Sequence, residues 1–336
     1  MQSSGSKFPL AAALIATLGA GCAAAGTQTP QLASVDISGA AWPHAAPHPD
    51  PGDSWMQPQA QACANDGVLP PCGLLYVSNY ATDDVSVYQR DKLVGTLTGF
   101  QSPDGLCSDR TGNVWITNNQ GASVVEYAHG KTVPISTLSD PGVYPLGCAV
   151  NPITGGLAVT NVASYGSGPG SVAIYHKAQG PPLVLSDPDI YFIYFCAYDP
   201  AGNLYVDGLN TSGAFQFAVL PRNKVKFKAI VLDKTVYFPG DVFWDGHHIV
   251  VGDQRYQNEN ASALYRTNGE GGSVLQTTVL DDATDAIGYW AHSNGVIAAD
   301  LARNAVDLYH YPQGGAPELH VPHFHNPYGL TVSVVH

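Results

Sequence analysis

Hydrophobic residues recur along the chain in a fixed order that three stretches show most clearly. The stretches are GLCSDRTGNVWITNN (105–119), GCAVNPITGGLAVTN (147–161) and FCAYDPAGNLYVDG (195–208). Each has an apolar segment, a turn that contains glycine, and a second segment in which apolar and other positions alternate. A period of two is typical of β-strands, and glycine beside Asn or Pro favours a tight turn. The pattern predicts pairs of short antiparallel strands.

The same order extends over most of the chain when its weaker copies are included. Second strands are expected at 74–79, 113–118, 156–161, 203–208, 248–253 and 295–300. A third strand with an aromatic residue follows each of them, and a fourth follows the third. The second strands begin 39, 43, 47, 45 and 47 residues apart. Four antiparallel strands repeated at this interval predict the blades of an all-β, six-bladed propeller, in which each sheet buries its faces against its neighbours.

The ends of the repeat predict how the ring closes. First strands precede the later blades, but none precedes 74–79, and the last apolar segment, YGLTVS (328–333), has no blade after it. An open ring would leave two unpaired strand edges and two exposed apolar faces. We therefore expect the C-terminal strand to be the inner strand of blade one.

One repeat resembles a known family. Its positions follow the order Pro-x-Gly, Asp, Gly-Asn-apolar-aromatic and Val-x-x-aromatic. They are Pro103, Gly105, Asp109, Gly112, Asn113, Trp115, Val124 and Tyr127. This order is similar to the NHL-type repeat, and the similarity covers residues 73–336. The resemblance implies a six-bladed propeller of the wider group that also holds gluconolactonase-like enzymes. It implies no activity, because this fold carries binders, lactonases and lyases.

The N-terminus reads as a targeting segment. Lys7 precedes the apolar stretch FPLAAALIATLGA, which is short for a membrane span, and LGAGC ends at Cys22. The end resembles a bacterial lipobox, in which the cysteine is lipidated. The alternative is plain secretion with cleavage after residues 23–25.

We divide the chain into a signal or lipoprotein segment (1–22), a Pro-, Ala- and Gln-rich tether (23–72) and the propeller (73–336). The expected location is outside the cytoplasm, as a membrane-anchored lipoprotein of the periplasm or cell surface or as a secreted protein.

Export permits disulfides, and five cysteines remain besides Cys22. Cys63 and Cys72 bracket a short turn-rich loop that a bridge could close. Cys148 and Cys196 stand in the same register of their strands, whereas Cys107 is offset by one and faces the other side of its sheet. Opposite faces of neighbouring blades can meet. We therefore predict a Cys107–Cys148 bridge and a buried, free Cys196.

Charge and composition exclude one class of partner. The chain has 27 Asp and Glu against 14 Lys and Arg, and no nucleic-acid-binding motif. A protein that holds phosphate backbones needs a basic face, so a nucleic acid is not expected as a partner. Membrane contact is expected only through the lipid anchor, and the protein is expected to be a monomer.

Short polar residues end most of the second strands. They are Asn79, Asn118, Asn161, Asp253 and Asp300. We favour a structural role, in which these side chains cap turns by accepting hydrogen bonds from backbone N–H groups. The alternative is that Asn118, Asn161, Asp253 and Asp300 supply oxygen ligands to Ca²⁺, the one cofactor that the sequence suggests.

Aromatic residues crowd the loops that lead into the first strands, and they break the repeat. The candidates for a binding rim around the channel mouth are Tyr144, Tyr191, Tyr194, Tyr237, Trp244, Tyr289, Trp290 and Tyr328, with Asp104 and Asp241 as polar contacts. Such a cluster could stack on a sugar, a peptide or an aromatic compound. Packing between blades is the alternative for any single ring.

These observations favour an exported propeller that binds a small molecule, a glycan or a protein of the cell envelope. A metal-dependent lactonase or lyase with its site in the central channel is the main alternative. A scaffold without a small-molecule site is the third.

Overall fold

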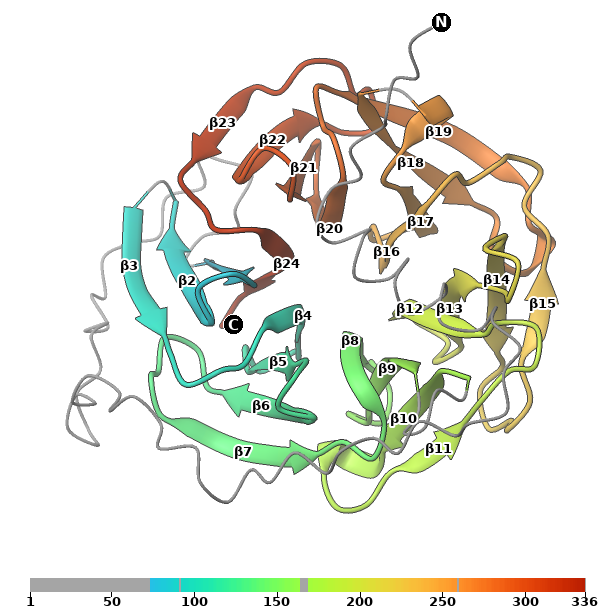
Figure 1. The fold of residues 1–336 in the computed structure, drawn as a ribbon, viewed down its shortest axis with the longest axis horizontal. Helices are drawn as coiled ribbons and strands as arrows, with labels where there is room; N and C mark the ends of the chain where they lie inside the picture. Colours follow the sequence, from blue (N-terminus) through green and yellow to red (C-terminus); the bar gives the residue numbers. More distant parts are fainter. Residues whose placement is uncertain (1–72, 91, 164–168, 259, 336) are drawn as a thin grey trace, which may run out of the picture. The chain divides into compact units, whose positions relative to one another are not determined.

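The computed structural model describes residues 73–90, 92–163, 169–258 and 260–335. Within these ranges the chain forms six four-stranded antiparallel sheets, as predicted. The first strands of the sheets surround a central axis and the fourth strands lie at the periphery (Figure 1). We number the sheets as blades in chain order, and blade one takes its inner strand from the C-terminus.

The blades contain the following strands, from the axis outward. Blade one is β24 (Pro327–Ser333), β1 (Leu74–Asn79), β2 (Asp84–Gln89) and β3 (Lys92–Leu97). Blade two is β4 (Pro103–Ser108), β5 (Val114–Asn118), β6 (Ser123–Tyr127) and β7 (Pro134–Ser139). Blade three is β8 (Val143–Val150), β9 (Leu157–Ala163), β10 (Ser171–Tyr175) and β11 (Leu183–Leu185).

The second half of the ring repeats the arrangement. Blade four is β12 (Phe192–Tyr198), β13 (Leu204–Leu209), β14 (Phe215–Leu220) and β15 (Lys228–Ile230). Blade five is β16 (Pro239–Trp244), β17 (Ile249–Asp253), β18 (Ala261–Thr267) and β19 (Val274–Asp281). Blade six is β20 (Ala286–His292), β21 (Gly295–Asp300), β22 (Ala305–His310) and β23 (Leu319–Pro322). Among the described residues, three short 3₁₀ turns lie in loops: η2 (His176–Ala178), η3 (Tyr256–Asn258) and η4 (Gly269–Gly271).

The C-terminal strand closes the ring, which confirms the prediction. β24 pairs antiparallel with β1, with Val332 opposite Leu75 and Leu330 opposite Val77. The first and last parts of the propeller therefore share one sheet (Figure 1). This pairing covers the inner edge of β1, which would otherwise expose unpaired backbone groups.

The hydrophobic core lies between the blades. Leu74 and Tyr76 of β1 pack with residues of blade two, while their neighbours Leu75 and Val77 pack with residues of blade six such as Ile297. Successive residues of a strand point to opposite faces of its sheet. Both faces of β1 are buried, so this strand reads as a continuous apolar run.

A disulfide links two neighbouring blades. Cys107 of β4 and Cys148 of β8 are bonded, with their Cα atoms 5.7 Å apart. Both lie in the apolar cluster between blades two and three, whereas Cys196 of β12 is a free, buried thiol between blades three and four. The one-residue offset of Cys107 turns its side chain toward blade three, and that offset was the basis for predicting the pair.

Candidate functional site

Every inner strand is irregular at the same place. In each blade the pairing between the first and the second strand changes register partway along the first strand. In blades two to six the change lies between residues 103 and 106, 145 and 148, 193 and 196, 239 and 242, and 286 and 288. In blade one it lies in β24, near residue 327. A bulge of this kind bends a strand and redirects its side chains. Here six bulges meet around the axis and form the waist of the central channel.

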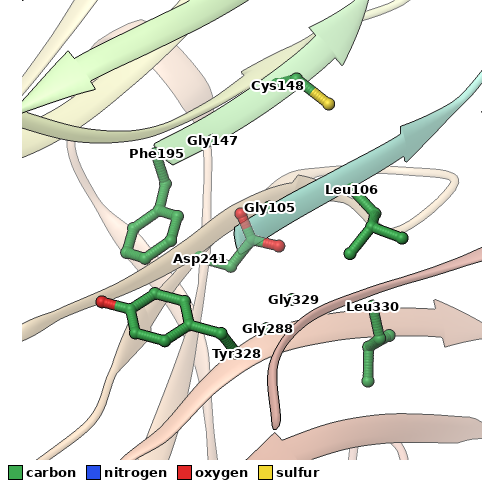
Figure 2. A pocket seen from close by; sticks show the side chains of 10 residues that line it. All are labelled: Gly105, Leu106, Gly147, Cys148, Phe195, Asp241, Gly288, Tyr328, Gly329 and Leu330. Carbon is green, nitrogen blue, oxygen red and sulfur yellow. The ribbon is translucent and has the colours of Figure 1, made fainter. Parts of the chain in front are cut away.

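One residue from each bulge lines a small cavity at this waist (Figure 2). In blade order from two to six and then one, they are Gly105, Gly147, Phe195, Asp241, Gly288 and Gly329. Leu106, Cys148, Tyr328 and Leu330 complete the wall. The volume that the centre of a water-sized sphere can occupy in this cavity is about 10 Å³. The cavity therefore has room for roughly one water molecule.

Glycine predominates at this position because the inner strands approach one another closely. A Cβ on Gly105 would lie 2.3 Å from the carbonyl oxygen of Leu146 in the next blade. A Cβ on Gly329 would lie 2.4 Å from the carbonyl oxygen of Asp104. The repeat is broken only in the adjacent blades four and five, where Phe195 and Asp241 take the position.

Asp241 contributes the carboxyl group of the cavity wall. In Figure 2 its carboxyl group projects inward, with the rings of Tyr328 and Phe195 on the same side of it. Burial raises the pKa of Asp241 to about 8, against the opposing effect of hydrogen bonds from the backbone N–H groups of Tyr289 and Val242. This carboxyl group therefore titrates near neutral pH.

A second repeated position lies directly behind the waist, on the second strands. In blades one to three it holds a hydroxyl, which joins two blades. Ser78 accepts a hydrogen bond from Gly329 N (2.8 Å) in its own blade and donates one to Asp104 O (2.6 Å) in the next. Thr117 likewise donates to Leu146 O at 2.8 Å. The hydroxyl needs both its donor and its acceptor capacity here.

Blade four replaces this hydroxyl with a carboxyl group. Asp207 Oδ1 accepts a hydrogen bond from Phe195 N at 3.0 Å, which is the acceptor half of the pattern. Oδ2 of this fully buried residue has no hydrogen-bond partner among the described residues. Burial raises the pKa of Asp207 well above its ordinary value, and the charge of Asp241 adds to the shift. The two carboxyl groups are therefore electrostatic neighbours at the junction of blades four and five.

Two further buried polar atoms near the axis lack partners within the described part of the chain. One is the hydroxyl of Tyr194, which precedes Phe195, and the other is Oδ1 of Asp104, which precedes Gly105. Asp104 Oδ2 accepts a hydrogen bond from Asn119 at 3.1 Å. Burial raises the pKa of Tyr194 and of Asp104. Unpaired buried polar atoms are costly, and further ones occur on Asp140, Asn161 and His248.

Aromatic and charged side chains continue from the waist toward the loops that lead into the inner strands. The ring of Tyr194 lies 6.2 Å from that of Phe238, and Arg255 lies over Phe238 at 4.9 Å. Arg255 also forms an ion pair with Asp285 at 3.1 Å. On the other side of the axis, the rings of Tyr328 and Tyr80 are 5.8 Å apart. We call the set of Tyr80, Tyr194, Phe238, Arg255, Asp285 and Tyr328 the channel mouth.

The structure separates the aromatic residues that the sequence grouped together. Tyr194 belongs to the channel mouth, and Tyr289 is buried behind the waist, where its hydroxyl donates to Ala286 O. Tyr144 and Tyr237 are exposed, at 36% and 41%, and the ring of half-buried Tyr191 meets that of Phe192 edge-on. These three precede or begin their inner strands and remain on the side of the mouth.

Two tryptophans do not belong to that side, which corrects the prediction. Trp244 is the last residue of β16, and Trp290 lies late in β20, where its ring stacks on His292. Both are therefore displaced along their strands toward the turns between first and second strands. The sequence grouped them with the rim by their nearness in the chain, although a strand of six or seven residues carries its two ends to opposite sides of the blade.

The polar residues that end the second strands tie down the loops of the mouth. Asn118 Oδ1 accepts a hydrogen bond from Gln101 N, and Asp253 accepts bonds from Tyr237 N and Phe238 N, both at 3.0 Å. Asp300 accepts a bond from Thr284 N at 3.0 Å, and burial raises its pKa to about 7. Asn161 packs against Gly142. The contacts of Asn118, Asp253 and Asp300 are of the capping kind that we favoured, whereas the side chain of Asn161 accepts no hydrogen bond from a backbone N–H group of the described residues.

Metal and anchor predictions are not decided by this geometry. Within the described ranges, no group of three or more His, Cys, Asp or Glu is arranged to hold a metal ion, and Ca²⁺ stays a prediction. Cys22, Cys63 and Cys72 lie outside the described residues. Among the described residues, no helix is both long and apolar enough to span a bilayer.

The fold has relatives among solved structures. No family model matches the chain, and no curated protein matches it. A chain of the crystal structure of a nidogen/laminin complex superimposes with a TM-score of 0.62 at 14% identity, over 78% of this chain and 98% of that chain. A protein of unknown function from Bacteroides caccae superimposes with a TM-score of 0.57 at 10% identity, with the same coverage. At these identities the likeness shows the fold alone, and the NHL-type resemblance stays a resemblance.

Proposed function

We propose that this protein is an exported binding propeller whose ligand or cell-envelope partner docks at the channel mouth and reaches Asp241. The observation that carries the proposal is the break in the lining of the waist. Four blades present glycine there, and the two exceptions, Phe195 and Asp241, are neighbours. A recognition site requires side chains that differ from those of the other blades. Closing a ring of similar blades does not require such a difference.

The channel mouth suits binding in its composition as well. It combines aromatic rings with one ion pair, and tyrosine and arginine are the residue types that carry much of the energy at protein interfaces. One propeller of similar fold occurs in a nidogen/laminin complex, so the fold is compatible with a protein partner. Export and lipid anchoring at Cys22 belong to this proposal on the strength of the N-terminal sequence.

A hydrolytic or lyase activity is the second candidate, and one observation favours it. A carboxyl group with a pKa of about 8 beside a cavity of one-water size has the properties of a general base. The metal-dependent form of this activity would in addition require Ca²⁺ or a similar ion. Turnover of a bound compound, lost in Asp241→Asn, would favour the enzyme over the binder.

A thermal-shift screen of small molecules and glycans against the purified protein tests the binding proposal. Compounds that stabilise the wild type are retested on Asp241→Asn and on Glu318→Gln. Glu318 is an exposed carboxylate on the periphery of blade six, paired with His310, so its substitution is the same carboxyl-to-amide change made far from the axis. We expect the stabilisation to disappear in Asp241→Asn and to persist in Glu318→Gln. Compounds that stabilise all three proteins equally would contradict an axial site.

A further inference from the structure

We propose that the cavity at the waist recognises a primary alkylammonium group, which enters through the channel mouth and exchanges with a proton held by the carboxyl groups there. This inference rests on the proposed function and names the chemistry of its ligand. The ammonium could belong to a small amine or to the side chain of a lysine, and the test below separates these two sources.

The charge of the site is the first argument. The wall of the cavity contributes one carboxyl group and no basic side chain, since its other members are four glycines and five uncharged residues. Asp207 lies behind the wall, where it interacts electrostatically with Asp241. Asp207 is fully buried and Asp241 is half-buried, and carboxyl groups in this setting are stabilised either by protons or by a cation.

The second argument is the supply of unused acceptors. Asp207 Oδ2, Asp104 Oδ1 and the Tyr194 hydroxyl oxygen are buried without a partner inside the described ranges. Their residues are at most 1% exposed. They lie next to the cavity wall and are not part of it: Asp104 precedes Gly105, Tyr194 precedes Phe195, and Asp207 accepts a hydrogen bond from Phe195 N. An ammonium group donates three hydrogen bonds and accepts none, so it complements a site that is rich in acceptors.

The third argument is size and wall chemistry, which separate an ammonium group from a metal ion. Space for roughly one water molecule suits an –NH₃⁺ group of similar size. The rings of Phe195 and Tyr328 border the same space, and aromatic faces attract organic cations. Ca²⁺ takes six to eight oxygen ligands, so most residues of this wall would have to contribute one. The wall consists mostly of glycine and apolar side chains, which carry no side-chain oxygen.

Proton exchange follows from the groups that face Asp241. They are Cys196 on β12, Asp207 on β13, Tyr289 on β20 and Tyr328 on β24. All four are acids whose pKa values burial raises, and none of them supplies a cationic counter-ion to Asp241. A cation binds the ionised carboxylate, so binding has to release the proton that Asp241 carries below its pKa of about 8.

Titration of the purified protein with ¹³C-methylammonium, observed by NMR, tests the inference. The affinity should be weak, on the order of millimolar, because so small a ligand supplies little binding energy. It should fall about 100-fold between pH 8.5 and pH 6, since only the ionised fraction of Asp241 is competent to bind. Asp241→Asn should abolish binding, Phe195→Leu should weaken it about three- to tenfold, and Glu318→Gln should leave it unchanged.

Titrations with other cations show which kind of cation the site binds. Nα-acetyl-lysinamide should bind if a lysine side chain can reach the waist, and binding of methylammonium alone would assign the site to small amines. Tetramethylammonium, which has no N–H donor, should not bind. Saturation by Ca²⁺ or K⁺ with no methylammonium binding would overturn the inference, as would methylammonium binding that Asp241→Asn leaves intact. If the screen above yields ligands that depend on Asp241 while methylammonium fails, the ammonium inference alone is wrong.

Discussion

Asp241 occupies a position that four blades fill with glycine, and its half-buried side chain borders the cavity. This difference is visible in the sequence once the first strands are aligned. Four of them have glycine at this position, and the other two have Phe195 and Asp241; the glycines are Gly105, Gly147, Gly288 and Gly329. Sequence analysis named Asp241 and Tyr194 but missed Phe195 and Asp207. An alternating apolar pattern marks Phe195 as ordinary core, and Asp207 stands out only beside Ser78 and Thr117 of the equivalent positions.

Asp241→Asn should flatten the dependence of stability on pH. The pKa of Asp241 rises from 3.8 in the unfolded chain to about 8 in the native protein, so between these values the native state binds more protons. Its contribution to stability is therefore lost as the pH rises, by at most about 1.4 kcal/mol per pH unit. The difference in free energy of unfolding between Asp241→Asn and wild type should grow in favour of the variant from pH 5 to pH 8. Urea denaturation at several pH values measures it, with Glu318→Gln as the control.

Gly329→Ala should destabilise the protein more than Gly99→Ala. The new Cβ at 329 would meet the backbone of Asp104 at 2.4 Å, whereas no atom lies within 4 Å of the same position at Gly99. Overpacking of this kind costs roughly 1–3 kcal/mol or more, while alanine at the positive φ of Gly99 costs about 1 kcal/mol. Midpoints of urea denaturation compare the two variants. Equal losses would mean that the inner strands do not meet as closely as described.

At the scale of the element, the buried strands were predictable and the outer ones less so. The second strands match their predicted ranges because both of their faces are buried and the apolar signal is continuous. For the outer strands the sequence predicted only their order in the repeat, and their lengths vary: that of blade one spans Lys92–Leu97, whereas that of blade four spans only Lys228–Ile230. These strands have one free edge and mostly exposed side chains, so burial does not fix their pattern.

Reduction of the Cys107–Cys148 bridge should lower stability measurably. The bridge joins inner strands of adjacent blades across 41 residues of sequence. Closing a loop of that size contributes about 2–4 kcal/mol, chiefly by restricting the unfolded chain. Dithiothreitol should lower the Tm of the wild type and of Cys196→Ala, but not that of a variant with alanine at both 107 and 148. An equal effect of the reductant on all three would show that the pair is not bonded in solution.

At the scale of the whole molecule, closure by β24 makes the propeller one cooperative unit. The circular arrangement could be deduced because the sequence has one first strand too many at the end and one too few at the start. The arrangement of side chains at the waist could not, because it depends on how six bulges from distant parts of the chain converge. That convergence is set by the twist and tilt of the blades, and no local pattern encodes it.

Removal of residues 327–336 should prevent folding of the ring. The deletion takes β24 away from β1 and exposes the apolar faces of Leu75 and Val77. We expect loss of the cooperative thermal transition and aggregation of the truncated chain. Addition of a peptide with the sequence of residues 327–336 should restore part of the native signal in circular dichroism, because it supplies the missing strand. A truncated chain that stays monomeric and unfolds like the wild type would contradict the closure.

The most direct test of the functional account is a crystal structure of the protein with a ligand taken from the screen. The account predicts electron density on the axis, in contact with Asp241 and between the rings of Phe195 and Tyr328. Density for the ligand on the periphery of the blades, with the waist unchanged, would contradict it.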